Sequence, residues 1–184
     1  MKIVRVLPSG RVVVCSDTSR VNRGEVYFVS QGYEYGLMPC VYFHLNGNSR
    51  RSAPHSMELL IDQFGFAYHL ENKTLATVGA EDARVYSEDR SLITGMSAPF
   101  SKREWHQIRE YTFDSSTPSS MLTFPSPDLA IVLSTLVSVT RWLTFNAGDW
   151  LVYGLLPTPF ALSCPTRVRL FANEKLVLDE LLRS

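Results

Sequence analysis

The sequence predicts an α+β fold in which a mostly antiparallel β-sheet, built from hairpins, packs against two or three helices. Short runs of β-branched and aromatic residues, typical of strands, outnumber the helical patterns. Turn residues join several of these runs directly, which favours antiparallel pairing. The length of 184 residues and a hydrophobic fraction of 45% suit one domain with a core. We therefore treat residues 1–184 as a single domain.

The first half of the chain reads mainly as strands. Two β-branched runs around Pro8-Ser9-Gly10 predict an N-terminal hairpin, and two further runs rich in Val, Tyr and Phe predict strands. Met57, Leu60, Ile61 and Phe64 recur at helical spacing and predict one short helix, followed by a second hairpin. The predicted strands of this half are Lys2–Val6, Arg11–Cys15, Glu25–Ser30, Cys40–Leu45, Phe66–Leu70 and Thr74–Val78.

The second half contains the main helix, predicted over about 127–143 from apolar residues at helical spacing after Ser126-Pro127-Asp128. Ser101 and Glu104 form a capping box that predicts another helix, with Trp105, Ile108 and either Tyr111 or Thr112 on its apolar face. The segment of about 114–127 holds five Ser, two Thr and three Pro, so we expect it to be loop-rich. Strands are predicted at Trp150–Tyr153, Arg167–Phe171 and Leu176–Asp179.

Composition excludes several classes of protein. The 18 basic and 18 acidic residues cancel, so a globally basic nucleic-acid binder is excluded. The N-terminus lacks a signal-peptide core, and the longest apolar run is too short to cross a bilayer. Cys15, Cys40 and Cys164 show no paired spacing and predict buried, reduced thiols. We expect a cytoplasmic or particle-assembling protein without a membrane partner.

Charge is distributed unevenly along the chain. Residues 1–55 carry seven basic and three acidic side chains, whereas residues 56–90 carry three basic and seven acidic ones. These segments could meet within one chain or between two copies of it. Arginine and tyrosine are enriched at protein interfaces. The residues expected to contact a partner are Arg20, Arg23, Tyr33, Tyr35, Arg50 and Arg51.

The sequence lacks a recognisable catalytic motif. His44, His55, His69 and His106 have no metal-binding spacing, and there is no nucleophile elbow, Walker loop or dinucleotide fingerprint. We therefore predict no catalytic residue, no metal ligand and no cofactor. The favoured function is a non-enzymatic binding or assembly module, such as a subunit of a viral particle, that contacts a protein partner or a second copy. Single-stranded nucleic acid is a weaker alternative, since tyrosines interleave with the basic residues.

The order of elements in the C-terminal third carries a family resemblance. Met121, Leu129–Ser134, Leu143–Gly154 and Thr166–Leu182 resemble the end of fumarylacetoacetate-hydrolase-like and 2-oxopentenoate-hydratase-like enzymes, in which a helix leads to a Gly-Asp turn, a strand and a closing strand pair. The resemblance implies a metal-dependent enzyme as the alternative function. Its metal site uses two glutamates spaced as ExE and a later Asp. Here Glu34 stands alone, with no glutamate two residues on, so the resemblance implies a shared fold with lost metal chemistry.

Overall fold

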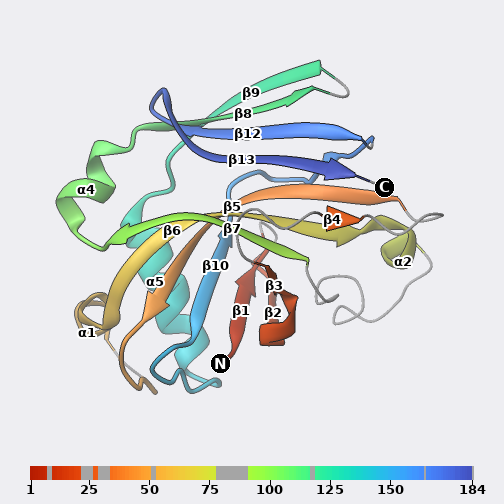
Figure 1. Ribbon diagram of the computed structural model, residues 1–184. Coiled ribbons are helices and arrows are strands. Elements are labelled where there is room, and N and C mark those ends of the chain that lie inside the picture. The colour runs from red at the N-terminus through yellow and green to blue at the C-terminus, as the bar shows by residue number, and fades with distance from the viewer. Residues whose placement is uncertain are drawn as a thin grey trace.

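The computed structural model describes residues 1–7, 10–21, 27–28, 34–50, 53–77, 91–116, 119–163 and 165–183. It confirms the predicted α+β class, with short helices and one longer helix packed against β-sheets (Figure 1). The helices are α1 (Pro54–Leu60), α2 (Lys73–Thr77), α4 (Lys102–Gln107) and α5 (Leu129–Thr140), with a 3-10 turn η1 (Asp17–Ser19).

The strands form two sheets. The eight-stranded sheet has the order β2 (Val12–Cys15), β1 (Ile3–Val6), β10 (Trp150–Gly154), β5 (Tyr35–Leu45), β6 (Ile61–Asn72), β7 (Leu92–Pro99) and β3 (Arg20–Val21), with β11 (Phe160–Ala161) also paired to β5. The five-stranded sheet has the order β4 (Tyr27–Phe28), β13 (Lys175–Arg183), β12 (Thr166–Ala172), β8 (Glu110–Ser116) and β9 (Ser119–Pro125).

Most strand pairs are antiparallel, as predicted. The exceptions among the described strands are β1 with β10, β3 with β7 and β13 with β4, which pair in parallel. The predicted N-terminal hairpin is confirmed, since β1 pairs antiparallel with β2 and Gly10 takes a positive φ in the turn. The predicted pair of C-terminal strands is also confirmed, with Asn173 and Glu174 at positive φ between β12 and β13.

Two predicted helices are confirmed. The main helix is α5, although its N-cap is Asp128, whose side chain accepts from Ala130 N, rather than Ser126. Helix α4 begins after Ser101, whose hydroxyl accepts a hydrogen bond from Glu104 N at 3.1 Å. Helix α4 ends at Gln107, so the prediction that this helix reaches Tyr111 or Thr112 is wrong; both residues lie in β8.

Other boundaries differ from the sequence predictions. The helix predicted over 56–64 ends at Leu60, and Ile61–Asn72 form one long strand because β6 pairs with both β5 and β7. The strand predicted over 74–78 is wrong, since Lys73–Thr77 is helix α2. The segment expected to be loop-rich contains the end of β8 and all of β9, which pair with each other. The prediction for Glu25–Ser30 is described only at β4.

The core lies on both faces of the eight-stranded sheet. One face packs against the five-stranded sheet and α5, which lie above and beside it in Figure 1, and it carries Phe43, Phe66 and Tyr68. The opposite face holds a smaller apolar cluster that includes Ile3, Cys40, Ala67 and Val152. Among the described helices, none combines the length and apolar character needed to span a membrane.

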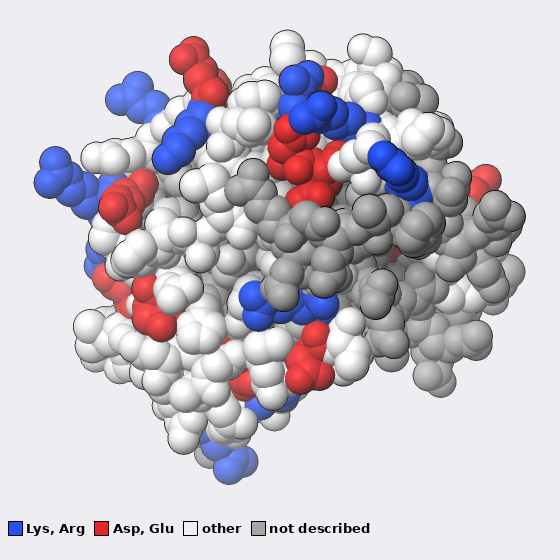
Figure 2. Space-filling view, viewed as in Figure 1, with Lys and Arg blue, Asp and Glu red and all other residues white. Residues whose placement is uncertain are grey.

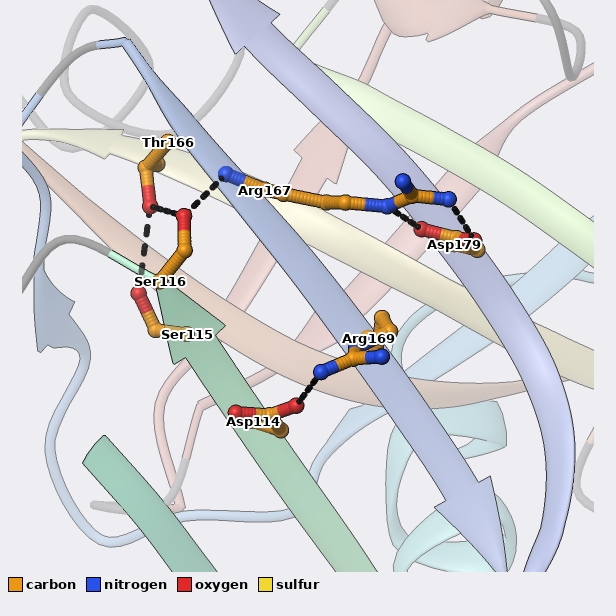
Figure 3. Close-up of polar contacts among 7 residues, drawn as sticks. All are labelled: Asp114, Ser115, Ser116, Thr166, Arg167, Arg169 and Asp179. Carbon is orange, nitrogen blue, oxygen red and sulfur yellow. Dashed lines mark hydrogen bonds and ion pairs between the residues drawn. The ribbon is translucent and has the colours of Figure 1, made fainter. Parts of the chain in front are cut away.

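The outer face of the five-stranded sheet is polar. Arg167 donates to both carboxylate oxygens of Asp179, at 2.8 and 2.6 Å, and Arg169 pairs with Asp114 on the neighbouring strand (Figure 3). On the opposite, buried side of the sheet, the Thr166 hydroxyl lies 3.2 Å from the Ser115 hydroxyl. Val168 and Leu170, which alternate with these arginines, face the core. This face is therefore a solvated surface stabilised by cross-strand ion pairs.

Candidate functional site

The face of the eight-stranded sheet that holds the smaller apolar cluster also carries charged and titratable side chains. Along β6, Phe66, Tyr68 and Leu70 face the large core, so the alternating residues Ala67, His69 and Glu71 face the other side. The register pairs His69 with Met38 and Glu71 with Gly36 on β5. Directly paired residues share a face, so the charged residues of β6 lie beside this part of β5.

Arg5 projects from β1 into this face and joins the charged residues. It is 0% exposed. Its Nη1 lies 3.4 Å from His69 Nε2, and its Nη2 lies 3.9 Å from Glu71 Oε2. Because a guanidinium can only donate, His69 Nε2 accepts here and must carry no proton. A buried cation is stable only when paired, and the Glu71 carboxylate supplies the opposite charge.

The cysteines of this face are not nucleophiles. Burial raises the pKa of the Cys40 thiol to about 12, against the weaker opposing effects of Arg5 and of a backbone hydrogen bond from His69. Burial likewise raises the pKa of Cys15 to about 11. The Cys40 thiol donates to Met38 O at 3.2 Å. Neither Cys15 nor Cys40 is in a disulfide, and both are buried, whereas Cys164 lies outside the described residues. Thiols that stay protonated and covered are structural.

At the end of this face nearest Glu34, Gly36 of β5 lies beside Lys73, the first residue of α2. A Cβ added to Gly36 would lie 2.6 Å from Pro159 Cβ and 2.7 Å from Lys73 Cε, so the Lys73 side chain crosses directly over this glycine. Lys73 N donates to Glu34 O at 2.8 Å. The carboxylate-bearing residues Glu34 and Glu71 therefore flank a position at which this chain has no side chain, covered by a lysine.

These residues do not fit a carboxylate-bound divalent cation. The ExE pattern would place a second glutamate at position 36, where its Cβ would lie only 2.6 Å from Pro159 Cβ. A lysine crosses the same position, and its ammonium charge repels a cation. Within the described ranges, no group of three or more His, Cys, Asp or Glu side chains is arranged to hold a metal ion.

A second group of polar and aromatic side chains surrounds Trp150 on the same face. Tyr42 stacks on Trp150 with ring centroids 4.2 Å apart, and the Arg20 guanidinium lies 4.3 Å from the Trp150 centroid. His44 Nδ1 lies 2.6 Å from Asp62 Oδ1. Gly65 allows this packing, because a Cβ there would lie 2.4 Å from Tyr42 Cζ. This group orders the Tyr42 and Trp150 rings.

Of the residues expected to contact a partner, the described part of the chain includes Arg20, Tyr35 and Arg50. Tyr35 is buried at the start of β5, whereas Arg20 and Arg50 are exposed. Arg23, Tyr33 and Arg51 lie outside the described residues. On the face drawn in Figure 2, basic and acidic groups lie next to one another. The basic and acidic segments of the sequence do meet within one chain, through Arg5 with Glu71 and His44 with Asp62.

A separate hollow of about 350 Å³ lies between the two sheets. Its walls are mainly apolar and include Phe64, Phe66, Ile108 and Val177. The nearby Asn173 amide is engaged, since its oxygen accepts from Arg109 N and its nitrogen donates to Gln107 O. No charged side chain in this hollow has a described partner network like that of Arg5, so the Arg5 face remains the candidate site.

Comparison with known proteins shows similarity of fold but not of sequence. No protein-family model matches the chain, and no curated protein does either. Solved structures do match. A fumarylpyruvate hydrolase from Pseudomonas aeruginosa in complex with Mn²⁺ and pyruvate aligns with a TM-score of 0.80 and 10% identity, covering 100% of this chain and 89% of that one. The chain has the fold of fumarylacetoacetate hydrolase family structures.

Two further structures support this fold assignment. A putative fumarylacetoacetate isomerase/hydrolase from Oleispira antarctica has a TM-score of 0.73 and 14% identity, covering 98% of this chain and 92% of that one. A 5-carboxymethyl-2-hydroxymuconate delta-isomerase from Mycobacterium smegmatis has a TM-score of 0.82 and 8% identity, covering 99% and 76%. The prediction of a non-enzymatic assembly module or virion component is therefore wrong. The likeness favours the alternative interpretation, drawn from the C-terminal third.

Sequence reasoning missed the residues of the candidate site. In the sequence, Arg5, Glu71 and Lys73 contribute only to the charge of their segments, and His69 has no metal-binding spacing. A signal was present, since Arg5 interrupts an apolar strand and His69 and Glu71 alternate with Phe66, Tyr68 and Leu70. Charged residues that alternate with apolar ones along a strand usually mark a solvated face. The burial of Arg5 and His69 distinguishes this face from such a surface.

Proposed function

We propose that this chain binds a small 2-oxo carboxylic acid on the Arg5 face of the eight-stranded sheet, at the end near Glu34 and Glu71. The observation that carries the proposal is the fold, which matches a fumarylpyruvate hydrolase over 100% of the chain. The Pseudomonas fumarylpyruvate hydrolase holds pyruvate in its structure.

The charged residues of this face support the proposal. Arg5 neutralises Glu71 and holds it beside Gly36, so the carboxylate does not repel an incoming anion as strongly as an unpaired one would. Lys73, which is half-buried, adds a positively charged side chain beside Gly36. Binding sites for small molecules typically place a few convergent polar groups within an otherwise apolar surface.

Thermal unfolding with pyruvate tests the proposal, with acetate as the matched anion that lacks the 2-oxo group. A ligand at one hundred times its Kd stabilises the folded state by about 2.7 kcal/mol. For a chain of this size, that corresponds to a rise in Tm of roughly 5–11 °C. Equal shifts with pyruvate and acetate, or no shift with either, would contradict specific binding of a 2-oxo acid.

The same protein can be assayed for hydrolysis of fumarylpyruvate, the substrate that names two of the similar enzymes. Turnover that disappears in Lys73→Gln but persists in Lys102→Gln would extend the proposal from binding to catalysis. Lys102 is an exposed lysine at the start of α4 and serves as the control.

A further inference from the structure

The hollow between the two sheets combines an apolar floor with two opposite charges at its rim. Its volume of about 350 Å³ is at the lower end of the range for small-molecule pockets. Burying an apolar group against such a floor favours binding, because both surfaces leave water. The floor consists of buried side chains from both sheets: Phe64 and Phe66 from β6, Ala172 from β12 and Val177 from β13.

Glu104 of α4 and Lys175 at the start of β13 supply the two charges. Both residues line the hollow, and both are exposed. Within the described part of the chain, neither the Glu104 carboxylate nor the Lys175 ammonium forms an ion pair or a hydrogen bond. One acceptor and one donor, both charged, are therefore available to a molecule that enters the hollow.

The two segments that carry these charges are tied together by the fold. Helix α4 and the turn between β12 and β13 lie side by side at one end of the molecule (Figure 1). The Asn173 amide joins them, since its oxygen accepts from Arg109 N at 2.8 Å and its nitrogen donates to Gln107 O at 2.6 Å. The backbone at Glu104 and Lys175 is thus held in place before a ligand binds, which lowers the entropy cost of binding.

We propose that this hollow is a second binding site, which takes a free amino acid with an apolar side chain, such as phenylalanine. In this arrangement the ring lies on the apolar floor, the ammonium faces Glu104 and the carboxylate faces Lys175. An amine or a carboxylic acid alone satisfies one charge and is repelled by the other. The hollow lies on the sheet face opposite Arg5, so this inference goes beyond the proposed function and does not depend on it.

Calorimetric titration of phenylalanine into the full-length protein tests the proposal. Three related molecules each lack one feature: phenethylamine lacks the carboxylate, phenylpropionate lacks the ammonium and alanine lacks the ring. Loss of a hydrogen bond to a charged group weakens binding by roughly tenfold or more. We therefore expect phenylalanine to bind at least about tenfold more tightly than each related molecule.

Charge variants separate the two contacts. Glu104→Gln should weaken the binding of phenylalanine and phenethylamine by roughly tenfold, without weakening that of phenylpropionate. Lys175→Gln should weaken phenylalanine and phenylpropionate, without weakening phenethylamine. The matched controls are Arg103→Gln and Glu110→Gln, because both residues are exposed and neither lines the hollow. Circular dichroism checks that each variant is folded.

A third variant tests the location of the site. Ala98 is half-buried in the wall of the hollow, so the longer side chain of Ala98→Leu takes the space of the ring and should abolish phenylalanine binding. If Ala98→Leu does not fold, the two exposed charge variants still decide the matter. Pyruvate affinity should be the same in Glu104→Gln as in the unaltered protein, since the Arg5 face lies on the other side of the sheet.

Three results would overturn the inference. The first is phenylalanine that does not bind, or binds no more tightly than phenethylamine and phenylpropionate. The second is phenylalanine binding that Glu104→Gln and Lys175→Gln leave at the level of the controls. The third is phenylalanine binding that persists in a folded Ala98→Leu variant. Failure to bind pyruvate refutes the proposed function alone, so the two proposals can fail separately.

Discussion

Replacing Arg5 by methionine removes the charge that pairs with Glu71 while keeping a long apolar stem. Arg5 is 0% exposed, and the Glu71 side chain is 13% exposed, so neither group is well hydrated. Removing one partner of a buried ion pair costs roughly 3–5 kcal/mol, because the other charge stays buried alone. The Nη2–Oε2 distance of 3.9 Å is long for an ion pair, so we expect the lower end, about 3 kcal/mol.

Urea unfolding followed by circular dichroism measures this loss. The matched control is Arg169→Met, which removes an arginine paired with Asp114 on the exposed face of the five-stranded sheet (Figure 3). Exposed pairs contribute about 0–1 kcal/mol. In the double variant Arg5→Met/Glu71→Gln, the cost should be well below the sum of the single ones, since the isolated charge is gone. An Arg5→Met cost below about 1 kcal/mol, equal to the control, would refute the reasoning.

Three further outcomes are expected. Gly65→Ala should destabilise the fold by about 1–3 kcal/mol, as measured by thermal unfolding. The reason is that the new Cβ would lie 2.7 Å from Met96 O and 2.5 Å from the Tyr42 hydroxyl. An unchanged Tm would contradict this packing. Burial acts to raise the pKa of Asp149, but hydrogen bonds from Lys2 and Asn146 outweigh it and hold the pKa below 3.8. Since the folded pKa is depressed, this stabilisation is present above about pH 4 and disappears as pH falls through the folded pKa. Asp149→Asn should flatten that part of the urea-stability profile, and an unaltered profile would argue against it. With its pKa near 12, Cys40 should resist iodoacetamide at pH 8 in the folded protein and react in urea, as read by peptide mass spectrometry; rapid labelling of native Cys40 would show an accessible thiolate.

Local signals in the sequence were sufficient where a segment's own residues decide its structure. The hairpin of β1 and β2 depends on a turn around Gly10, and α4 begins at the Ser101 cap, so both could be predicted. The segment Ile61–Phe64 could not, although Ile61 and Phe64 fit a helical repeat. Pairing of β6 with β5 and β7 outweighs that local preference.

The candidate site was harder to predict because its members meet only through the fold. Arg5 and His69 lie 64 positions apart in the sequence. No spacing rule connects them, since the contact depends on how β1 and β6 are placed in one curled sheet. No pattern in the sequence marks Gly36 as a site residue either. Its importance appears only when Pro159 and Lys73 are seen to occupy the space of its missing side chain.

The measurement that tests the account most directly is a crystal structure grown with pyruvate and Mn²⁺, with data collected at the manganese absorption edge. We expect pyruvate on the Arg5 face, at the end near Glu34 and Glu71, and no anomalous peak between these two carboxylates. A manganese peak bound by Glu71, or pyruvate bound elsewhere on the chain, would contradict the proposed function.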